Sequence, residues 1–560
     1  MNPSPLNPQS AKRLSLVLGL SMLVVGVCGL SYEYSFSRLA TGILGDSTKQ
    51  WALVIGVMMF FMGLGADLQK HLGNDQMVER FIGIEILLGL LGGFGPSLSL
   101  YAFGYWNELF VVVHYLLIAG VGLLIGLEIP LLVRVNELCL PSLKDNLGLI
   151  LKMDYAGSFI GALAWVFVLP RFLDLLEIPY LLGLLNVFVA LGTLFFFRTF
   201  VARTWVLGLT GVLAAGALGL GLWLGEPIRL FLEQRLYKDP VVLSQTSRYQ
   251  HILFTQNAAG RLDCFINGHL QFSSRDEQIY HEFLVHPALS ALQSPKRVLV
   301  LGGGDGLAVR ELLRYPGLES VTLVDLDPVM TGLAQEYPPL VALNQGSLKA
   351  PKVRLVEPQG VIEGERVLLE ERGNGFFKRL KAPEPVEVSL FHLDAFNFAR
   401  SAPGTYDLIL LDFPDPNDPE LSKLYSLEFY RSLKGLLNPQ GLMVQQSTSP
   451  SVAHEAFLII GRTLQEAGFS TLALHQVIPS FGDWGFWVAG AAEDYPGQVL
   501  GQQVSRPREL PPGLVYLTSE LIGAAQVFGK GQLDMEGIPV NRLLAERLFE
   551  AYHQAWARQQ

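Results

Sequence analysis

Residues 297–311 read RVLVLGGGDGLAVRE. A short apolar run ends in three glycines, one aspartate and a fourth glycine, and a helical pattern begins directly afterwards. Glycine has no side chain, so it permits a sharp turn and a close approach of other groups to the backbone. The segment predicts a strand, a tight turn and a helix of an α/β sheet. A single glycine cluster is weak evidence for a binding site, so its meaning depends on the remainder of the chain.

The composition indicates a membrane protein. The chain has 560 residues, of which 50% are hydrophobic and 16% charged. It is too long for one ordinary domain and too apolar for an ordinary soluble one. The net charge of -10 argues against a nucleic-acid partner, because surfaces that bind nucleic acids are rich in lysine and arginine. Cys28, Cys139 and Cys264 are scattered, and their spacing predicts neither a disulfide framework nor a metal site.

The apolar residues are concentrated in the first 225 positions. About seven stretches there are long enough to cross roughly 30 Å of hydrocarbon at about 1.5 Å per helical residue. We therefore expect a helical domain that spans a lipid bilayer over 1–225. The expected spans are 14–34, 51–69, 81–103, 108–133, 155–175, 179–198 and 204–224.

The second half of the chain has the pattern of an α/β domain. From Arg229 onward, short apolar runs alternate with polar helical patterns. We expect a linker and a small β-rich segment over 226–290 and a Rossmann-like domain over 291–500. That domain should carry an insertion at about 340–380, and a helical tail should follow over 501–560.

Four predicted strands of this domain end beside an aspartate. Asp305 lies in the glycine turn, and Asp325 ends the next apolar run. Asp394 and Asp412 follow two later apolar runs. In an open parallel sheet the carboxyl ends of the strands share one crevice, so we expect the four carboxylates to meet there. Taken singly, each aspartate is also compatible with a helix cap or a turn.

The turn favours a sulfonium nucleoside over a redox dinucleotide. Gly302 and Gly304 leave room for an adenosine, and Asp325 suits the two hydroxyls of a ribose. The turn reads GGGDG rather than GxGxxG, and Asp305 would repel a pyrophosphate. The predicted fold is therefore a multi-span α-helical membrane domain followed by an α/β domain of the S-adenosylmethionine-dependent methyltransferase-like type.

Several ordered motifs over about 240–495 resemble the spermidine synthase family, the polyamine aminopropyltransferases. The similarity is greatest to bacterial members that carry a multi-span membrane half. The segments that carry the resemblance are SRYQHI (247–252), NGHLQFSSRDEQIYHEFLVHPAL (267–289), GGGDGLAVREL (302–312), LVDLDP (323–328), LDAF (393–396), LLDFPDP (410–416), LEFYRSLKGLLNPQGLMVQQSTSP (427–450) and IPSFGDWGF (478–486), with SYEYSFSRL (31–39) and VYLTSELIGAAQVF (515–528) outside that range.

The resemblance implies an enzyme that transfers an aminopropyl group from decarboxylated S-adenosylmethionine, its co-substrate, to a polyamine. Putrescine as acceptor would give spermidine and methylthioadenosine. The family uses no metal and no permanently bound cofactor, and a homodimer or homotetramer is expected. Asp412 is implied as the catalytic base. The implied donor residues are Gln250, Gly302, Gly304, Asp305, Asp325, Asp394 and Ala395, and the implied acceptor residues are Gln271, Tyr280, His281, Asp415 and Phe481.

Three features depart from the soluble family members. His281 replaces a glutamine that is common there. Phe481 stands where soluble spermidine synthases have a tyrosine, so the acceptor site lacks one hydroxyl and the identity of the acceptor stays open. The insertion at 340–380 occupies the place of a short link, and we expect it to form a hairpin over the site.

Elementary chemistry agrees with these implied roles. The acceptor amine has a solution pKa near 10, so exposing its lone pair at pH 7 costs roughly 4 kcal/mol unless a base removes the proton. Asp412 would be that base. Asp305 near the donor's free amine would disfavour intact S-adenosylmethionine, whose extra carboxylate would meet a like charge at a cost of about 1–4 kcal/mol.

Other functions are compatible with parts of the sequence. A small-molecule methyltransferase can use the same sheet, but LDFPDP is not the motif expected of one. An inactive binding module is disfavoured because Asp412 is present. Glu33, Glu85 and Glu128 lie in or near apolar stretches, where carboxylates can mark a cation path, so polyamine binding or transport is a further alternative. Pairing with a neighbour such as Arg38, or an interfacial position, would instead make them structural.

The chemistry and the loop charges predict opposite sides of the membrane for the second half. We expect a multi-pass protein of the cell membrane. Lysines and arginines on the N-terminal tail and the even-numbered loops place the N-terminus inside. With seven spans, this bias would put the α/β domain outside. The co-substrate is cytosolic, and on that ground we expect the domain in the cytoplasm.

Overall fold

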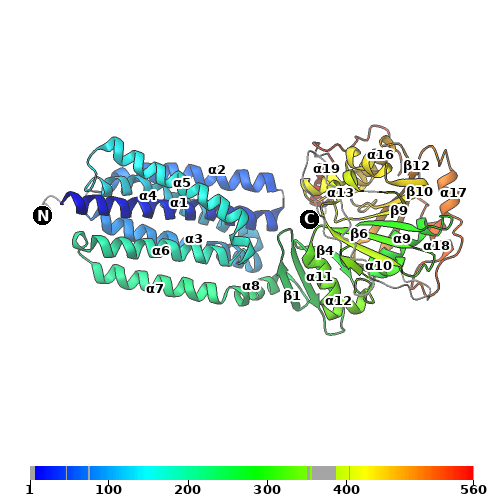
Figure 1. Cartoon of the computed structure of the whole chain (residues 1–560), viewed down its shortest axis with the longest axis horizontal. Coiled ribbons are helices and arrows are strands. Elements are labelled where there is room, and N and C mark those ends of the chain that lie inside the picture. Colours follow the sequence, from blue (N-terminus) through cyan, green and yellow to red (C-terminus); the bar gives the residue numbers. More distant parts are fainter. Residues whose placement is uncertain are drawn as a thin grey trace, which may run out of the picture. The chain divides into compact units, whose positions relative to one another are not determined.

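The chain divides into two compact units. In the computed structural model, residues 7–45, 47–73, 76–349, 353–355, 386–402, 404–545 and 547–558 are described. The first unit is Met1–Ser244 and the second is Gln245–Gln560. Figure 1 shows helices in the first unit and a mixture of helices and strands in the second.

Seven helices of the described part of the first unit are long and apolar enough to cross a membrane. Their number agrees with the sequence pattern, but the limits 155–175 were wrong for the fifth. That helix starts earlier and ends before Pro170, because the residue that precedes a proline is disfavoured in an α-helix. The helices are α1 (Pro8–Leu44), α2 (Ser47–Leu68), α3 (Met77–Tyr105), α4 (Phe110–Asn136), α5 (Leu143–Phe167), α6 (Glu177–Phe197) and α7 (Thr204–Trp223).

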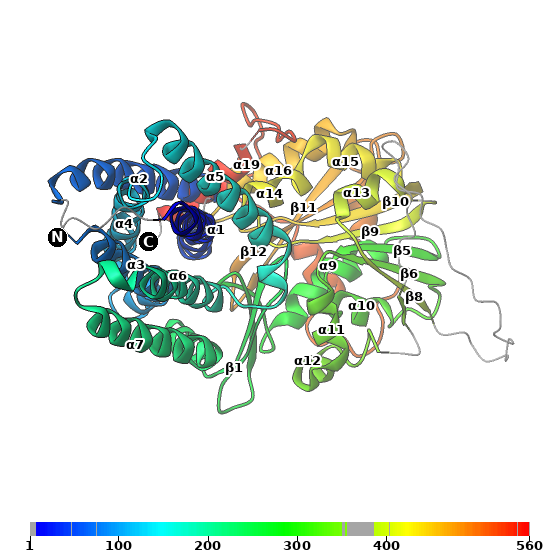
Figure 2. The same cartoon turned by 60° about the vertical axis from the view of Figure 1, so that its left-hand side comes forward.

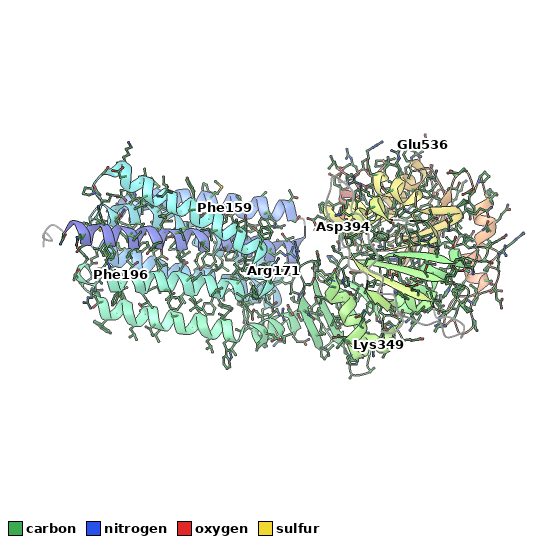
Figure 3. The ribbon with its side chains drawn as sticks, viewed as in Figure 1. Phe159, Arg171, Phe196, Lys349, Asp394 and Glu536 are labelled. Carbon is green, nitrogen blue, oxygen red and sulfur yellow. The ribbon has the colours of Figure 1, made fainter. Side chains whose placement is uncertain are left out.

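The helices pack at backbone contact. Helix α1 lies at the centre of the bundle in Figure 2. A Cβ atom on Gly157 of α5 would lie 2.1 Å from the carbonyl oxygen of Leu23 in α1. Small residues at such contacts are typical of helices within a membrane, where close packing replaces the hydrophobic effect. On the outside, large apolar side chains such as Phe159 and Phe196, labelled in Figure 3, are exposed, as expected of surfaces that face lipid.

A short helix and a small sheet follow the bundle. Helix α8 (Gly225–Glu233) is anchored by Arg229, whose guanidinium lies 2.8 Å from Asp174. The four-stranded sheet has the order β1-β2-β3-β4, and its pairs β2–β3 and β3–β4 are antiparallel. Its strands are β1 (Val241–Thr246), β2 (His251–Gln256), β3 (Leu262–Ile266) and β4 (His269–Ser273).

The main sheet of the second unit has eight strands in the order β11-β12-β10-β9-β5-β6-β8-β7. Strands β10, β9, β5, β6, β8 and β7 pair in parallel, whereas β12 is antiparallel to β10 and to β11. The strands are β5 (Arg297–Gly302), β6 (Ser320–Asp325), β7 (Val353–Leu355), β8 (Glu387–His392), β9 (Tyr406–Asp412), β10 (Leu437–Gln446), β11 (Phe469–Ile478) and β12 (Gly482–Ala491).

Helices cover both faces of this sheet. In Figure 2, α9 to α12 lie on one side and α13 to α16 on the other. The middle of the central strand β9 is therefore apolar, and Leu408 to Leu411 have no exposed surface. The helices are α9 (Glu277–Leu289), α10 (Leu307–Leu312), α11 (Pro328–Glu336), α12 (Pro338–Leu343), α13 (Ala395–Ser401), α14 (Pro419–Ser422), α15 (Leu427–Lys434), α16 (His454–Glu466), α17 (Val499–Val504), α18 (Ser519–Ala524) and α19 (Arg547–Ala557).

The strand order reverses between β5 and β9. From β5 the chain proceeds through β6 to β8 on one side, and β9 and β10 lie on the other side. In open α/β sheets, ligands bind at such a reversal, outside the carboxyl ends of the strands. The glycine turn and Asp412 both lie at this point. The predicted hairpin within 340–380 falls largely outside the described residues.

Candidate active site

The glycine turn needs its glycines for steric reasons. Gly302 and Gly303 have φ angles of +80° and +69°, which residues with side chains rarely adopt. A Cβ atom on Gly302 would lie 2.2 Å from the carbonyl oxygen of Asp412, and one on Gly304 would lie 2.5 Å from Oδ2 of Asp325. The turn therefore brings bare backbone against the main chain of Asp412 and the carboxylate of Asp325.

Asp325 is held at the end of β6 by the turn itself. Its Oδ2 accepts a hydrogen bond from the N–H of Gly304 at 2.9 Å, and its Oδ1 accepts one from the N–H of Asp327 at 2.8 Å. Burial raises the pKa of Asp325 to about 7. Asp327 has a different role. It caps α11 through Val329 and receives a hydrogen bond from the hydroxyl of Ser247.

Asp305 lies inside the turn. Its Oδ1 accepts a hydrogen bond from the N–H of Leu307 at 2.8 Å, and Asn344 donates to its backbone carbonyl at 2.9 Å. Burial raises the pKa of Asp305 to about 6. The nearby positive charge of His281 lowers it and the negative charge of Asp412 raises it. Asp305, His281 and Asp412 thus share one electrostatic environment.

Asp412 ends β9 and is hydrogen-bonded to Tyr280 of α9. The Tyr280 hydroxyl donates to Asp412 Oδ1 at 2.6 Å. Burial raises the pKa of the Asp412 carboxyl, while the His281 charge and the Tyr280 hydrogen bond oppose that rise. The carboxylate is thus fixed in direction and still has one oxygen that can accept a proton.

A buried ion network holds His281 beside these acids. His281 Nδ1 lies 2.9 Å from Glu277 Oε2, and the two oxygens of Glu277 lie 2.7 and 2.9 Å from the guanidinium of Arg310. Burial alone would lower the pKa of His281. The hydrogen bond to Glu277 and the charges of Glu277, Asp305 and Asp412 together raise it to about 9. At pH 7 the site therefore contains an imidazolium. The sequence motif predicted His281 as a site residue, but it did not predict that Glu277 connects His281 to Arg310.

Asp415 accepts three hydrogen bonds from distant parts of the chain. Thr448 Oγ1 donates at 3.0 Å and Gln446 Nε2 lies at 3.2 Å. The third partner is Tyr552 in the C-terminal helix α19. Burial raises the pKa of Asp415 to about 6, and these hydrogen bonds oppose the rise. The sequence did not predict a role for Tyr552, because no motif links α19 to the LDFPDP segment at 411–416.

The other predicted residues are less directly joined to this centre. Asp394, labelled in Figure 3, caps α13 through Asn397 and lies 2.9 Å from Lys423, so it has the helix-cap role allowed for it above. Ala395 beside it is buried. The Phe481 ring lies near the rings of Trp484 and Tyr280, with centroids 5.0 and 6.4 Å away. Gln250 and Gln271 are half-buried, and Gln271 donates to the carbonyl of His269.

Comparisons with known proteins show which family the chain belongs to. Residues 277–362 and 359–496 match the Spermine/spermidine synthase domain family. The polyamine aminopropyltransferase of Leptospira interrogans is 36% identical over 97% of this chain and 99% of that protein. That of Oceanobacillus iheyensis is 35% identical over 98% of each. The chain belongs to the polyamine aminopropyltransferase family.

The resemblance predicted from the motifs is therefore confirmed, and the protein is a polyamine aminopropyltransferase. Both relatives match along nearly their whole length, so the helical unit is part of the similarity. Among solved structures, spermidine synthase from Thermotoga maritima is similar with 20% identity and a TM-score of 0.41. That match covers 53% of this chain and 88% of the other.

Proposed function

We propose that the enzyme transfers the aminopropyl group of decarboxylated S-adenosylmethionine to putrescine, with Asp412 as the general base. The observation that carries this proposal is the contact of Tyr280 with Asp412 at the strand reversal, beside the glycine turn. A buried carboxylate fixed at the carboxyl end of the central strand can both attract an ammonium and accept its proton.

The donor fits the turn. The glycine turn has no side chain that would keep an adenosine away, and Asp325 keeps lone pairs for the two ribose hydroxyls. Asp305 would face the free ammonium of the aminopropyl chain. Its carboxylate would repel the extra carboxylate of intact S-adenosylmethionine, which supports the decarboxylated form as substrate.

The reaction needs a base and correct positioning. The lone pair of the acceptor nitrogen attacks the aminopropyl carbon bound to sulfur, and a C–N bond forms as the C–S bond breaks. The electron pair of the broken bond goes to the sulfonium, which becomes the neutral thioether of methylthioadenosine. The proton lost by the acceptor nitrogen goes to Asp412. The sulfonium already activates the carbon, so alignment of the two substrates supplies much of the remaining acceleration.

The charge of His281 keeps the base in its active form. An ionised carboxylate is required, and burial works against ionisation of Asp412. The imidazolium of His281 lowers the pKa of Asp412, and Glu277 with Arg310 keeps the imidazole charged and fixed. We therefore assign His281 and Glu277 positioning and electrostatic roles.

The acceptor is assigned to the side of the site that contains Asp415 and Phe481. An aliphatic diamine presents an apolar chain between two ammonium groups. Phe481, Trp484 and Tyr280 form an aromatic group for the chain, and Asp415 would hold the distal ammonium. Without the hydroxyl found in soluble members, Phe481 offers only apolar contact.

An amine panel tests this assignment. The detergent-purified full chain would be assayed with labelled decarboxylated S-adenosylmethionine and putrescine, cadaverine, spermidine or monoamines. We expect the highest kcat/KM with putrescine and release of one methylthioadenosine per transfer. A higher kcat/KM with spermidine would contradict putrescine as acceptor, and methyl transfer from intact S-adenosylmethionine would contradict the donor.

A further inference from the structure

Two carboxylates lie in the interior of the helical unit. Glu85 of α3 and Glu128 of α4 have no exposed surface, and their side chains are within hydrogen-bonding reach of each other. None of their four oxygens accepts a hydrogen bond from a donor elsewhere in the described part of the chain. In the described part of the chain, neither carboxylate pairs with a cationic neighbour such as Arg38, and neither has the exposure of an interfacial position.

Neutral polar groups lie near the pair. Tyr32 of α1 is fully buried, its hydroxyl has no partner in the described chain, and it lies close enough to interact with both carboxylates. Asn186 of α6 is also fully buried, and neither atom of its amide group has a partner there. It packs at Gly89, one helical turn from Glu85. Hydroxyl and amide groups can donate to a carboxylate but cannot neutralise its charge.

The other titratable groups near the pair are acidic as well. Cys28 of α1 interacts with both carboxylates, and Asp154 of α5 interacts with Glu128. Helix α2 contacts α4 through the backbone of Met62, a residue without a titratable side chain. Two adjacent ionised carboxylates in an apolar interior would be very unfavourable without a compensating cation. The positive charge must therefore come from outside the described chain.

The packing favours the smallest possible cation. A Cβ atom on Gly126 of α4 would lie 2.0 Å from the carbonyl oxygen of Met62, and one on Gly92 of α3 would lie 2.5 Å from the ring of Tyr32. Helices at backbone contact leave little room for a hydrated ion or an amine. Within the described residues, no three His, Cys, Asp or Glu side chains are placed to hold a metal. A proton needs only the two carboxylates.

We propose that Glu85 and Glu128 form an exchangeable proton site in the interior of the helical unit. The pair holds one proton between its two carboxylates, and Tyr32 and Asn186 supply hydrogen bonds to the oxygens when the proton leaves. Ionisable residues within membrane helices commonly mark proton relays. This site is independent of aminopropyl transfer, which uses residues of the other unit.

Infrared spectroscopy of the full chain in lipid nanodiscs tests the proposal. Protonated carboxylic acids have a C=O band that ionised carboxylates lack. We expect a band in the wild type that titrates with pH, shifts in heavy water, and is absent from the Glu85→Gln/Glu128→Gln double variant. Glu33→Gln, which removes a half-buried carboxyl of α1, is the matched control and should retain the band. Retained aminopropyl transfer and an unchanged elution volume would show that the variants are folded.

Other results would overturn the proposal. A spectrum of the double variant identical to that of the wild type would show that the pair carries no proton. A band that does not shift in heavy water would show that the proton does not exchange. Loss of the band on adding Na⁺ or spermine at constant pH would assign the site to that cation instead. If the double variant does not fold, each single Glu→Gln variant should still move the band, and an unmoved band would contradict a shared proton.

Discussion

Gly302 and Asp412 lie opposite each other on the neighbouring parallel strands β5 and β9. A Cβ atom at Gly302 would lie 2.2 Å from the carbonyl oxygen of Asp412, and Gly302 has a φ of +80°. We therefore expect Gly302→Ala to displace the end of β9 and to destabilise the fold by about 1–3 kcal/mol. Denaturant unfolding and kcat/KM measure the two effects. Gly317→Ala, at an exposed glycine with open space around it, is the control and should change neither.

Asp305 should determine the choice of donor. We expect the enzyme to bind decarboxylated S-adenosylmethionine at least about tenfold more tightly than the intact form, which corresponds to 1.4 kcal/mol. Burial raises the pKa of Asp305 to about 6, so the carboxylate is ionised above that pH and the preference should weaken as pH falls through 6. Calorimetry with both compounds at pH 8 and pH 5 measures this. Asp305→Asn should reduce the preference at pH 8, and an unchanged ratio would assign the discrimination to another residue.

His281 should control the pH dependence of the reaction. It is charged below a pKa of about 9 and lowers the pKa of Asp412. Removing this charge in His281→Gln should raise the pKa of Asp412, so the acid limb of the kcat/KM profile should move to higher pH. Each unit of movement lowers activity on that limb about tenfold. A uniform loss at every pH, with the limb unmoved, would indicate a purely structural role.

Amine binding should depend on Asp415 and on the C-terminal helix. Asp415 has a pKa raised to about 6, so its ionised form, and with it amine binding, should be lost as pH falls through 6. Asp415→Asn should raise KM for the amine about 10- to 100-fold, with a smaller change in kcat. Tyr552→Phe removes one hydrogen bond from Asp415 and keeps the ring. The rise of KM at low pH should then begin at a higher pH, and an unchanged profile would exclude Tyr552 from the acceptor site.

The sequence predicted those parts of the site that depend on local pattern. The pattern of a strand followed by a tight turn predicted the glycines, where a Cβ atom would clash. The crevice shared by the carboxyl ends of parallel strands predicted the carboxylates that follow β5, β6 and β9. Asp394 shows the limit of this reasoning. An aspartate after a strand can cap the next helix as well as contact a ligand. Asp394 caps α13 and pairs with Lys423, and its role toward the donor stays a prediction.

Contacts between distant segments could not be predicted in this way. Tyr552 reaches Asp415 across more than a hundred residues of chain, and Arg310 reaches Glu277 from another helix. No periodicity or spacing encodes such pairs. The pairing of Glu85 with Glu128 similarly depends on how α3 and α4 pack. Even the end of α5 depended on one residue, Pro170, within an apolar run.

The role of Asp412 is the central claim, and Asp412→Asn tests it most directly. Asparagine keeps the size of the side chain and can still accept the Tyr280 hydrogen bond, but it cannot take the proton of the amine. Single-turnover rates at saturating putrescine should fall about 10²- to 10⁴-fold, while unfolding and binding of methylthioadenosine change little. Asp418→Asn is the matched control. It removes a nearby carboxylate that caps α14, and it should react at the wild-type rate. A folded Asp412→Asn enzyme with a near-normal single-turnover rate would contradict the mechanism.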